Sequence, residues 1–272
     1  MVSHLEKLKK HGVTMMIKYL KNFLSLQALS LCCLSLFAGA ALAQEAAEPE
    51  AEGSIGRMGD SAVVDVNTYE FSPAERKIWL NDHLQNVEKP ARLYYEFVKS
   101  GSYEEGFTDA VYLDIIEVND DGSKNAELEF FTADRQQQAS RDNLSNITGN
   151  PVIGIYMQGD VIEMNRITDG HWRYFQRRIK MAFSESAEIT NVNIDFNGSV
   201  VEGEKIAIHP YVKDPRRRDF ARFADKSYEF IFSDNIPGSL YQIRTVIPDT
   251  SSKASGVLIE ETLTLKSYEV KS

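Results

Sequence analysis

Residues 150–183 read NPVIGIYMQGDVIEMNRITDGHWRYFQRRIKMAF and lie between two blocks of alternating apolar and polar residues. Asn150 and Pro151 are typical of a helix N-cap and a first helical residue. The apolar residues that follow recur at helical spacing and predict one long helix that breaks at Asp169-Gly170. A second helix is predicted from His171 to about Phe183. The stretch therefore predicts a helical hairpin.

A shorter first helix is an alternative. Gly154 and Gly159 weaken the long helix, because each costs about 1 kcal/mol relative to alanine in a helix interior. Residues 152–157 would then form a strand, and the helix would begin at Asp160 with Glu163 completing a capping box. The long helix is the preferred interpretation.

Apolar and polar residues alternate on both sides of this hairpin, which is typical of half-buried antiparallel strands. Asp121-Gly122 and Asn197-Gly198 supply turns between them. Residues 135–150 lack periodicity and predict a loop or a weak surface helix. The expected strands include residues 92–97, 111–116, 126–130, 192–196, 206–208, 228–232, 241–245 and 257–265.

An N-terminal helix is predicted to precede the strands. Ser72 can cap it, Pro73 fits its first turn, Glu75 can complete a capping box, and the helix is expected to run to about Val87. The whole pattern predicts an α+β fold. We expect a single curved antiparallel sheet of about eight strands, with the helical hairpin inserted into the chain and the N-terminal helix packed on the sheet.

The first residues are typical of a secretory signal peptide. Lys18 and Lys21 precede an apolar run at residues 23–40, and Ala41-Leu42-Ala43 forms a small-residue cleavage site. Residues 1–43 are therefore expected to be removed, with the true start at Met15 or Met16. These features predict export to the periplasm, and the chain should not be an integral membrane protein after cleavage.

The remaining chain divides into a flexible acidic linker at residues 44–60 and a single α+β domain at residues 61–272. Cys32 and Cys33 would leave with the signal peptide, so disulfides and thiol chemistry are excluded from the mature chain. The formal charge of −10 becomes about −14 after cleavage, because five lysines and one glutamate are lost. An acidic balance argues against nonspecific binding to nucleic acid or anionic lipid.

Motifs for catalysis or cofactor binding are not found. The sequence contains no G-x-S-x-G motif and no glycine-rich phosphate loop, and His83, His171 and His209 are too widely separated for a typical zinc site. We expect no metal and no cofactor. Asp160 and Glu163 are the carboxylates to inspect first, although an ordinary i,i+3 pair between Glu163 and Arg166 is the favoured interpretation.

Two clusters of basic residues stand out against the acidic background. Their planar guanidinium groups could hold a carboxylate, a phosphate or an acidic partner through bidentate hydrogen bonds. Neutralisation by nearby acidic residues is favoured unless the two clusters meet in space. The residues are Arg173, Arg177, Arg178 and Lys180 in the first cluster and Arg216, Arg217, Arg218 and Arg222 in the second.

Large apolar side chains on the concave side of the sheet are candidates for a ligand pocket. A curved sheet under a helical hairpin could enclose a lipid or another apolar ligand. Core packing is the favoured alternative. The pocket candidates are Tyr95, Phe97, Phe130, Phe230, Phe232 and Tyr241.

Two resemblances bear on function. The sequence resembles an uncharacterised family of exported proteobacterial proteins, which implies no activity, and the order of strands around a helical insert resembles the lipoprotein-carrier fold. That fold is an incomplete β-barrel whose helical cover shelters acyl chains, and since no motif supports this second likeness, no site residue is transferred from it. The residues that carry the first likeness are Asn150-Pro151, Asp160-Val161, Met164, Arg166, Thr168, Gly170, Tyr174-Phe175 and Arg178-Ile179.

Three functional hypotheses follow from the sequence. The first is a non-enzymatic periplasmic binding or carrier module for an apolar or amphiphilic ligand. The second is an envelope assembly or interaction protein whose arginine-rich helix binds an acidic partner, such as another protein of the envelope. The third is a hydrolase whose catalytic carboxylates have not been located.

Overall fold

The computed structural model describes residues 70–136, 144–250 and 256–271. The predicted signal peptide and acidic linker lie outside these residues, so both remain predictions. Nearly all of the described residues belong to one compact unit, Phe71–Ser272. Among them, no helix is both long and apolar enough to cross a membrane.

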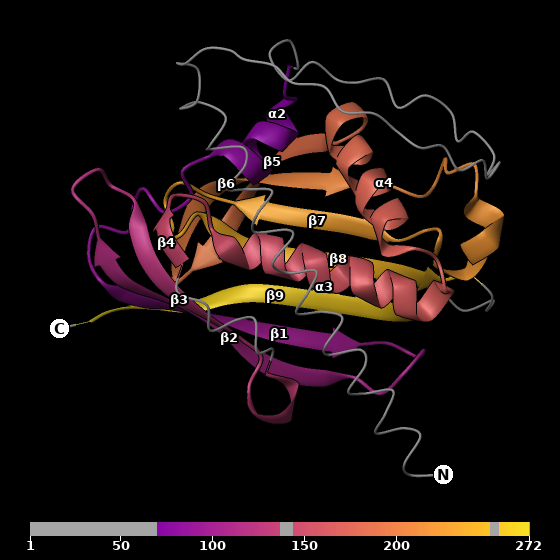
Figure 1. Ribbon diagram of the computed structural model, residues 1–272, viewed down its shortest axis with the longest axis horizontal. Coiled ribbons are helices and arrows are strands. Elements are labelled where there is room, and N and C mark those ends of the chain that lie inside the picture. Colours follow the sequence, from indigo (N-terminus) through magenta and orange to yellow (C-terminus); the bar gives the residue numbers. More distant parts are fainter. Residues whose placement is uncertain (1–69, 137–143, 251–255, 272) are drawn as a thin grey trace, which may run out of the picture. The chain divides into compact units, whose positions relative to one another are not determined.

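One antiparallel sheet of nine strands forms the framework, in the order β4-β3-β2-β1-β9-β8-β7-β6-β5 (Figure 1). The last strand of the chain pairs with β1 on one side and β8 on the other, so it joins the early and late strands at the centre. The strands are β1 Ala91–Ser100, β2 Phe107–Val118, β3 Lys124–Phe130, β4 Leu144–Ile147, β5 Glu188–Phe196, β6 Ser199–Ile208, β7 Ser227–Phe232, β8 Leu240–Asp249 and β9 Gly256–Val270.

The two faces of the sheet differ in chemistry. In β1, Leu93, Tyr95 and Phe97 are buried on the inner face and alternate with more exposed residues. The outer face carries ion pairs between neighbouring strands, such as Arg92 with Asp114, whose side chains lie 2.7 Å apart. One apolar face and one charged face are what the alternating sequence predicted.

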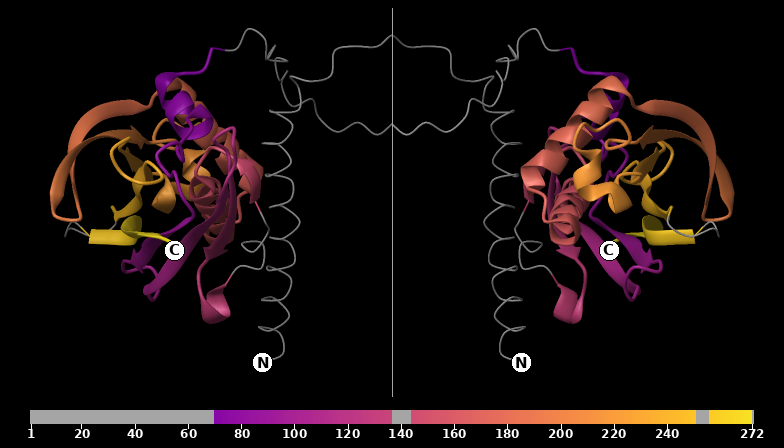
Figure 2. Two further views of the ribbon diagram at one scale, coloured as in Figure 1. Left: turned by 90° about the vertical axis from the view of Figure 1, so that its left-hand side faces the viewer. Right: turned by 90° about the vertical axis from the view of Figure 1, so that its right-hand side faces the viewer.

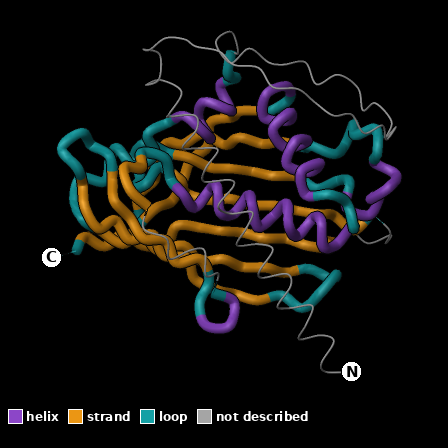
Figure 3. Tube along the Cα trace, viewed as in Figure 1, coloured by secondary structure: helices purple, strands orange, loops and turns teal. Residues whose placement is uncertain are grey.

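Two long helices cover the inner face (Figures 1 and 3). They are α3, Pro151–Thr168, and α4, Trp172–Glu185. Figure 2 shows the sheet curving around them from the side. The α+β fold with an inserted helical hairpin is therefore confirmed, with nine strands rather than about eight.

The ends of both helices agree with the sequence. The Asn150 side chain accepts a hydrogen bond from the Val152 N–H, and α3 ends at Asp169, whose φ of 57° is left-handed. His171 caps α4 through its ring nitrogen, which accepts from the Arg173 N–H. Because α3 is continuous from Pro151, the alternative with a strand at residues 152–157 is wrong.

The N-terminal helix is shorter than predicted. The capping box at Ser72 and Glu75 is present, but α2 covers only Pro73–Glu75 and continues as the π-helical turn η1, Arg76–Leu80. The prediction that it reaches Val87 is wrong. The chain becomes extended at Asn81, whose side chain, like that of Asp82, favours turns over helix interiors.

The loop predicted over residues 135–150 is also partly wrong. Residues 144–147 form the short edge strand β4, which pairs with β3, and residues 137–143 lie outside the described part of the chain. Short edge strands bury one side at most and carry little hydrophobic alternation, so residues 144–147 show no strand pattern.

Candidate functional site

A row of polar side chains crosses the otherwise apolar inner face of the sheet. Lys99 of β1 is the register partner of Glu261 of β9, and Glu261 is the partner of Thr245 of β8. Thr245 is in turn the partner of Tyr228 of β7. All four residues are buried. Four neighbouring strands therefore place hydroxyl and charged groups side by side beneath a helix.

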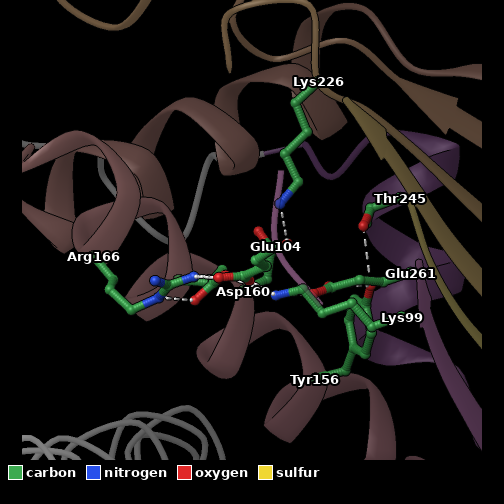
Figure 4. Close-up of polar contacts among 9 residues, drawn as sticks. Lys99, Glu104, Tyr156, Asp160, Arg166, Lys226, Thr245 and Glu261 are labelled. Carbon is green, nitrogen blue, oxygen red and sulfur yellow. Dashed lines mark hydrogen bonds and ion pairs between the residues drawn. The ribbon is translucent and has the colours of Figure 1, made fainter. Parts of the chain in front are cut away.

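Helix α3 faces this row with polar residues of its own. Tyr156, Asp160 and Glu163 are spaced i, i+4 and i+7, so they share one side of the helix. The Tyr156 hydroxyl lies 3.2 Å from the Thr245 hydroxyl and donates to Glu261 over 3.4 Å (Figure 4). The contact between α3 and the sheet is thus partly polar.

Lys99 lies at the centre of a charged cluster. Its Nζ atom is 2.6 Å from Glu104, 2.8 Å from Glu163 and 3.3 Å from Glu261. Arg166 closes the cluster on the solvent side, with its guanidinium 2.8 Å from Glu104 and 2.6 Å from Glu163. We call these five residues the Lys99 cluster. It contains three carboxylates and two cations.

Burial and neighbouring charges change the pKa values in opposite directions here. Burial opposes ionisation of Glu163, but the Arg166 and Lys99 side chains outweigh it and lower the pKa of Glu163 to about 2. Burial would also lower the pKa of Lys99, yet the Glu261 and Glu163 carboxylates raise it. Glu261 is buried most deeply, and burial raises its pKa despite the nearby lysines.

A second ion pair lies deeper along α3. The Lys226 ammonium bonds to Asp160, and the Tyr228 hydroxyl donates to the other oxygen of this carboxylate over 2.7 Å. The Tyr211 hydroxyl lies 3.2 Å from that of Tyr228. Burial raises the pKa of Tyr228 well above its ordinary value, so this hydroxyl keeps its proton and stays a donor. Each Asp160 oxygen therefore has a partner.

A cluster of four phenylalanines adjoins the Lys99 cluster. Phe97 lies 5.3 Å from Phe107 and 4.8 Å from Phe131 between ring centroids, and Phe130 lies 4.7 Å from Phe131. We call these residues the aromatic cluster. Phe97 and Phe130 are buried, whereas Phe107 and Phe131 remain half-exposed. Because Phe107 is the register partner of Lys99, the aromatic and charged groups are immediate neighbours.

Phe131 joins the aromatic cluster through an unusual backbone conformation. Its φ of 65° is left-handed, which is rare for a bulky side chain. In a regular strand Phe131 would point to the face opposite Phe130. Asp109 holds the distorted chain, because its carboxylate accepts hydrogen bonds from the Thr132 N–H at 2.9 Å and from the Thr132 hydroxyl at 2.7 Å.

The predicted apolar residues do not form one group. Phe97 and Phe130 belong to the aromatic cluster. Phe230 contacts Phe183 of α4, and Phe232 stacks on His83. The buried Tyr95 hydroxyl accepts from Asn150, and half-buried Tyr241 donates to the Asp195 carbonyl.

The two predicted basic clusters do meet in space. Arg178 of α4 forms an ion pair of 2.6 Å with Asp214, in the segment that precedes Arg216. The Arg216 guanidinium lies 5.1 Å from the centroid of the Tyr174 ring. Helix α4 and residues 209–225 are therefore packed side by side.

Lys99, Glu261 and Lys226 were missed in the sequence. The available signal was alternation, because Lys99 follows Leu93, Tyr95 and Phe97 at inner positions of β1. A charged residue in that position is either at a strand end or buried with partners. The predicted i,i+3 pair of Glu163 and Arg166 is confirmed, but Asp160 lies within the helix and does not cap it. Within the described ranges, no group of three histidine, cysteine or acidic residues is arranged to hold a metal ion.

Comparison with known proteins gives a structural likeness only. No protein-family model and no curated protein matches the sequence. The solved structures of similar fold include the lipoprotein LppX of Mycobacterium tuberculosis, with a TM-score of 0.30 and 7% identity over 70% of this chain and 93% of that chain. This likeness is distant. At this TM-score the comparison gives a distant structural likeness that carries no argument about function, and no sequence family is shown.

Two further solved structures show an equally distant likeness. LprF of Mycobacterium bovis has a TM-score of 0.25 and 13% identity over 74% of this chain and 95% of its own. A LolA-superfamily protein of Nitrosomonas europaea has a TM-score of 0.20 and 8% identity, over 73% and 94%. The functional argument below therefore rests on the residues of this chain.

Proposed function

We propose that this chain is a periplasmic, non-enzymatic binding or carrier module for an apolar or amphiphilic ligand. The observation that carries the proposal is the half-exposed aromatic cluster directly beside the Lys99 cluster. An amphiphile needs an apolar surface for its chain and polar partners for its headgroup. Both are present at one end of the inner face, where Phe107 and Phe131 are incompletely covered and the Arg166 side chain of the Lys99 cluster is 52% exposed.

The strained backbone at Phe131 supports this site. Left-handed conformations of large residues cost free energy and persist where surrounding contacts hold them, often at ligand-binding sites. Here the Asp109 hydrogen bonds hold Phe131 against Phe97 and Phe107. The strain therefore serves to add one more aromatic ring to the inner face.

A buried amide in α3 has no hydrogen-bond partner within the part of the chain that the structure describes. The Gln158 side chain is 2% exposed, and its Nε2 atom has no hydrogen-bond partner among the described residues. A buried donor without a partner costs about 1–3 kcal/mol. Gln158 is two residues from both Tyr156 and Asp160, so it lies on another side of α3 from the Lys99 cluster.

Hydrolysis is the less favoured alternative. Asp160 is bonded to Lys226 and Tyr228, and Glu163 is held by Lys99 and Arg166. A catalytic carboxylate needs to reach a substrate or a water molecule. Both candidates are instead committed to partners within the protein, which supports binding over catalysis.

The proposal can be tested with a fluorescent fatty acid as the probe. We expect saturable binding to the wild-type protein and about tenfold weaker binding for Phe107→Ala, a loss of about 1.4 kcal/mol. Tyr112→Ala is the matched control, because Tyr112 lies on the same strand but stacks on Tyr94, with their centroids 5.3 Å apart, on the outer face. No saturable binding to the wild type, or equal weakening in both variants, would contradict the proposal.

A second candidate function is binding of a negatively charged partner through the arginine-rich helix α4. It is favoured by the finding that the two basic clusters meet at Asp214. Replacement of Arg173, Arg177 and Lys180 by alanine should abolish recovery of such a partner. Unchanged recovery would count against this function.

A further inference from the structure

Basic residues are concentrated in two segments of an otherwise acidic chain. The whole sequence has 30 basic and 40 acidic residues. Residues 171–184 nevertheless contain four basic and no acidic residues, and residues 209–225 contain five basic and three acidic ones. These two segments therefore reverse the sign of the charge locally.

Asp214 joins the two segments. Its side chain is fully buried and lies 2.6 Å from the Arg178 guanidinium. The same carboxylate accepts hydrogen bonds from the Tyr174 hydroxyl and from the Arg216 N–H. The rings of Phe175 and Phe220 pack edge to face beneath these polar contacts, 5.5 Å apart. The two segments thus form one continuous structure.

The three aspartates neutralise only three of the nine basic residues. Asp214 pairs with Arg178, Asp219 with Arg216, and Asp225 with Arg217. The other six basic residues are exposed and form no ion pair with any described residue. We call them the basic surface: Arg173, Arg177 and Lys180 of α4, and Lys213, Arg218 and Arg222 of the neighbouring segment.

The three cations of α4 share one outward side. Arg173, Arg177 and Lys180 are spaced i, i+4 and i+7, and all three are exposed, whereas Phe175 and Ile179 face the core. Three unpaired like charges on one helix face repel each other. Such an arrangement gains free energy when an anionic surface approaches it.

Apolar side chains accompany the charges. Trp172 is half-buried, and the Arg173 guanidinium lies 5.0 Å from the centroid of its ring. Val212, next to Lys213, is 43% exposed. Tryptophan is enriched at the headgroup level of bilayers, and the stems of arginine and lysine can lie along apolar surface while their charges reach phosphates.

We propose that the basic surface docks the protein on an anionic phospholipid bilayer. This inference deepens the second candidate function and rests on it, and it does not require a ligand at the aromatic cluster. Because the rest of the chain is acidic on balance, this face can approach a negative membrane more favourably than the chain as a whole. Docking should therefore have one orientation, with the outward side of α4 toward the phosphates.

A bilayer fits this surface better than a folded acidic protein does. The six cations project from the outside of a helix and of a neighbouring segment, and four of them are long arginine side chains. Laterally mobile phosphates can adjust to such side chains, whereas a folded partner must match them with fixed carboxylates. The neighbouring Trp172 and exposed Val212 also suit the boundary between headgroups and acyl chains.

Flotation with vesicles tests the proposal. The full chain without its leader should float with vesicles that contain phosphatidylglycerol at low salt, and should not float with vesicles of pure phosphatidylcholine. Removal of three positive charges should weaken binding at least about a hundredfold, since each basic residue near an anionic surface contributes about 1 kcal/mol. The variant is the triple substitution Arg173→Glu, Arg177→Glu and Lys180→Glu.

The matched control changes net charge equally at other sites. Lys89→Glu, Lys266→Glu and Lys271→Glu replace three exposed lysines outside the basic surface and should leave most of the binding intact. Circular dichroism checks that both triple variants fold. Absence of flotation with anionic vesicles, or equal loss in both variants, would overturn the proposal. The proposal would also be overturned if the wild type bound an acidic protein but no vesicles, and the first variant lost that protein binding.

The ligand assay separates this proposal from the first candidate function. Both triple variants should bind the fluorescent fatty acid like the wild type, because no residue of the aromatic cluster is changed. Loss of flotation with normal probe binding supports the docking role alone. Normal flotation without any probe binding would instead overturn only the first candidate function.

Discussion

Lys226 and Asp160 form an ion pair in which the side chains are only 2% and 1% exposed. Lys226 immediately precedes β7, and Asp160 lies in the middle of α3, so the pair connects the helical cover to the sheet. Transfer of two charges from water to such a site costs several kcal/mol per ion before their attraction is counted. The main role of the pair is therefore to fix the position of α3 on the sheet, and its net contribution to the free energy of folding is small.

Breaking this pair should be strongly destabilising. We expect Lys226→Met to lower the free energy of unfolding by about 3–5 kcal/mol, because Asp160 would keep a buried charge without its cation. Denaturation in urea measures the change. Lys205→Met is the matched control, since the more exposed pair of Lys205 and Glu229 on the outer face contributes about 1 kcal/mol or less. Similar losses in both variants would contradict the role assigned to Lys226.

The loss of folding free energy at acidic pH should depend on Glu163. Its pKa falls from 4.5 to about 2 on folding, so its contribution is complete above 4.5 and is lost as the pH falls toward 2. Glu163→Gln should therefore lower stability at pH 7 by about 1–3 kcal/mol and flatten the decline between pH 5 and pH 3. Urea denaturation at both pH values checks this. An unchanged slope would show that Glu163 is not the titrating group.

Glu261 should make the folded protein less stable as the pH rises, which is the opposite of the effect of Glu163. Because burial raises its pKa, its folded form holds a proton more tightly than the unfolded chain does. That contribution is complete below the ordinary carboxyl pKa and is lost as the pH rises through the raised value. The neutral variant Glu261→Gln should gain stability relative to the wild type as the pH rises from 4 to 8. A constant difference in the free energy of unfolding across this range would contradict the prediction.

The unpaired amide of Gln158 predicts that its removal does not destabilise the protein. In ligand-free protein, Gln158→Met should be neutral or stabilising by about 1 kcal/mol, because it removes a buried donor and keeps a similar volume. Gln242→Met is the control, since Gln242 donates to Thr264 over 2.9 Å and should lose that bond. Destabilisation of the ligand-free Gln158 variant would show that the amide is satisfied.

Much of the fold could be predicted because its signals are local. The Asn150 cap, Pro151 and the left-handed stop at Asp169 define α3, and strict alternation defines β1. The N-terminal helix was predicted too long because residues 84 and 87 are buried without being helical. Strand β4 was missed because four residues at an edge carry little periodicity.

The candidate site was harder to predict because it depends on register between distant strands. Lys99 and Glu261 are 162 positions apart and become neighbours only when β9 inserts between β1 and β8. No local pattern specifies that pairing. Asp160 and Glu163 could be identified as candidates from one helix, whereas their partners Lys226 and Lys99 come from elements that the helix meets only in the folded chain.

Native mass spectrometry of the protein purified from its native cells tests the central claim most directly. We predict a bound population heavier by the mass of a lipid or other amphiphile, which Phe107→Ala reduces and Tyr112→Ala retains. Protein that carries no such adduct, and that acquires none when incubated with envelope lipids, would contradict the carrier function.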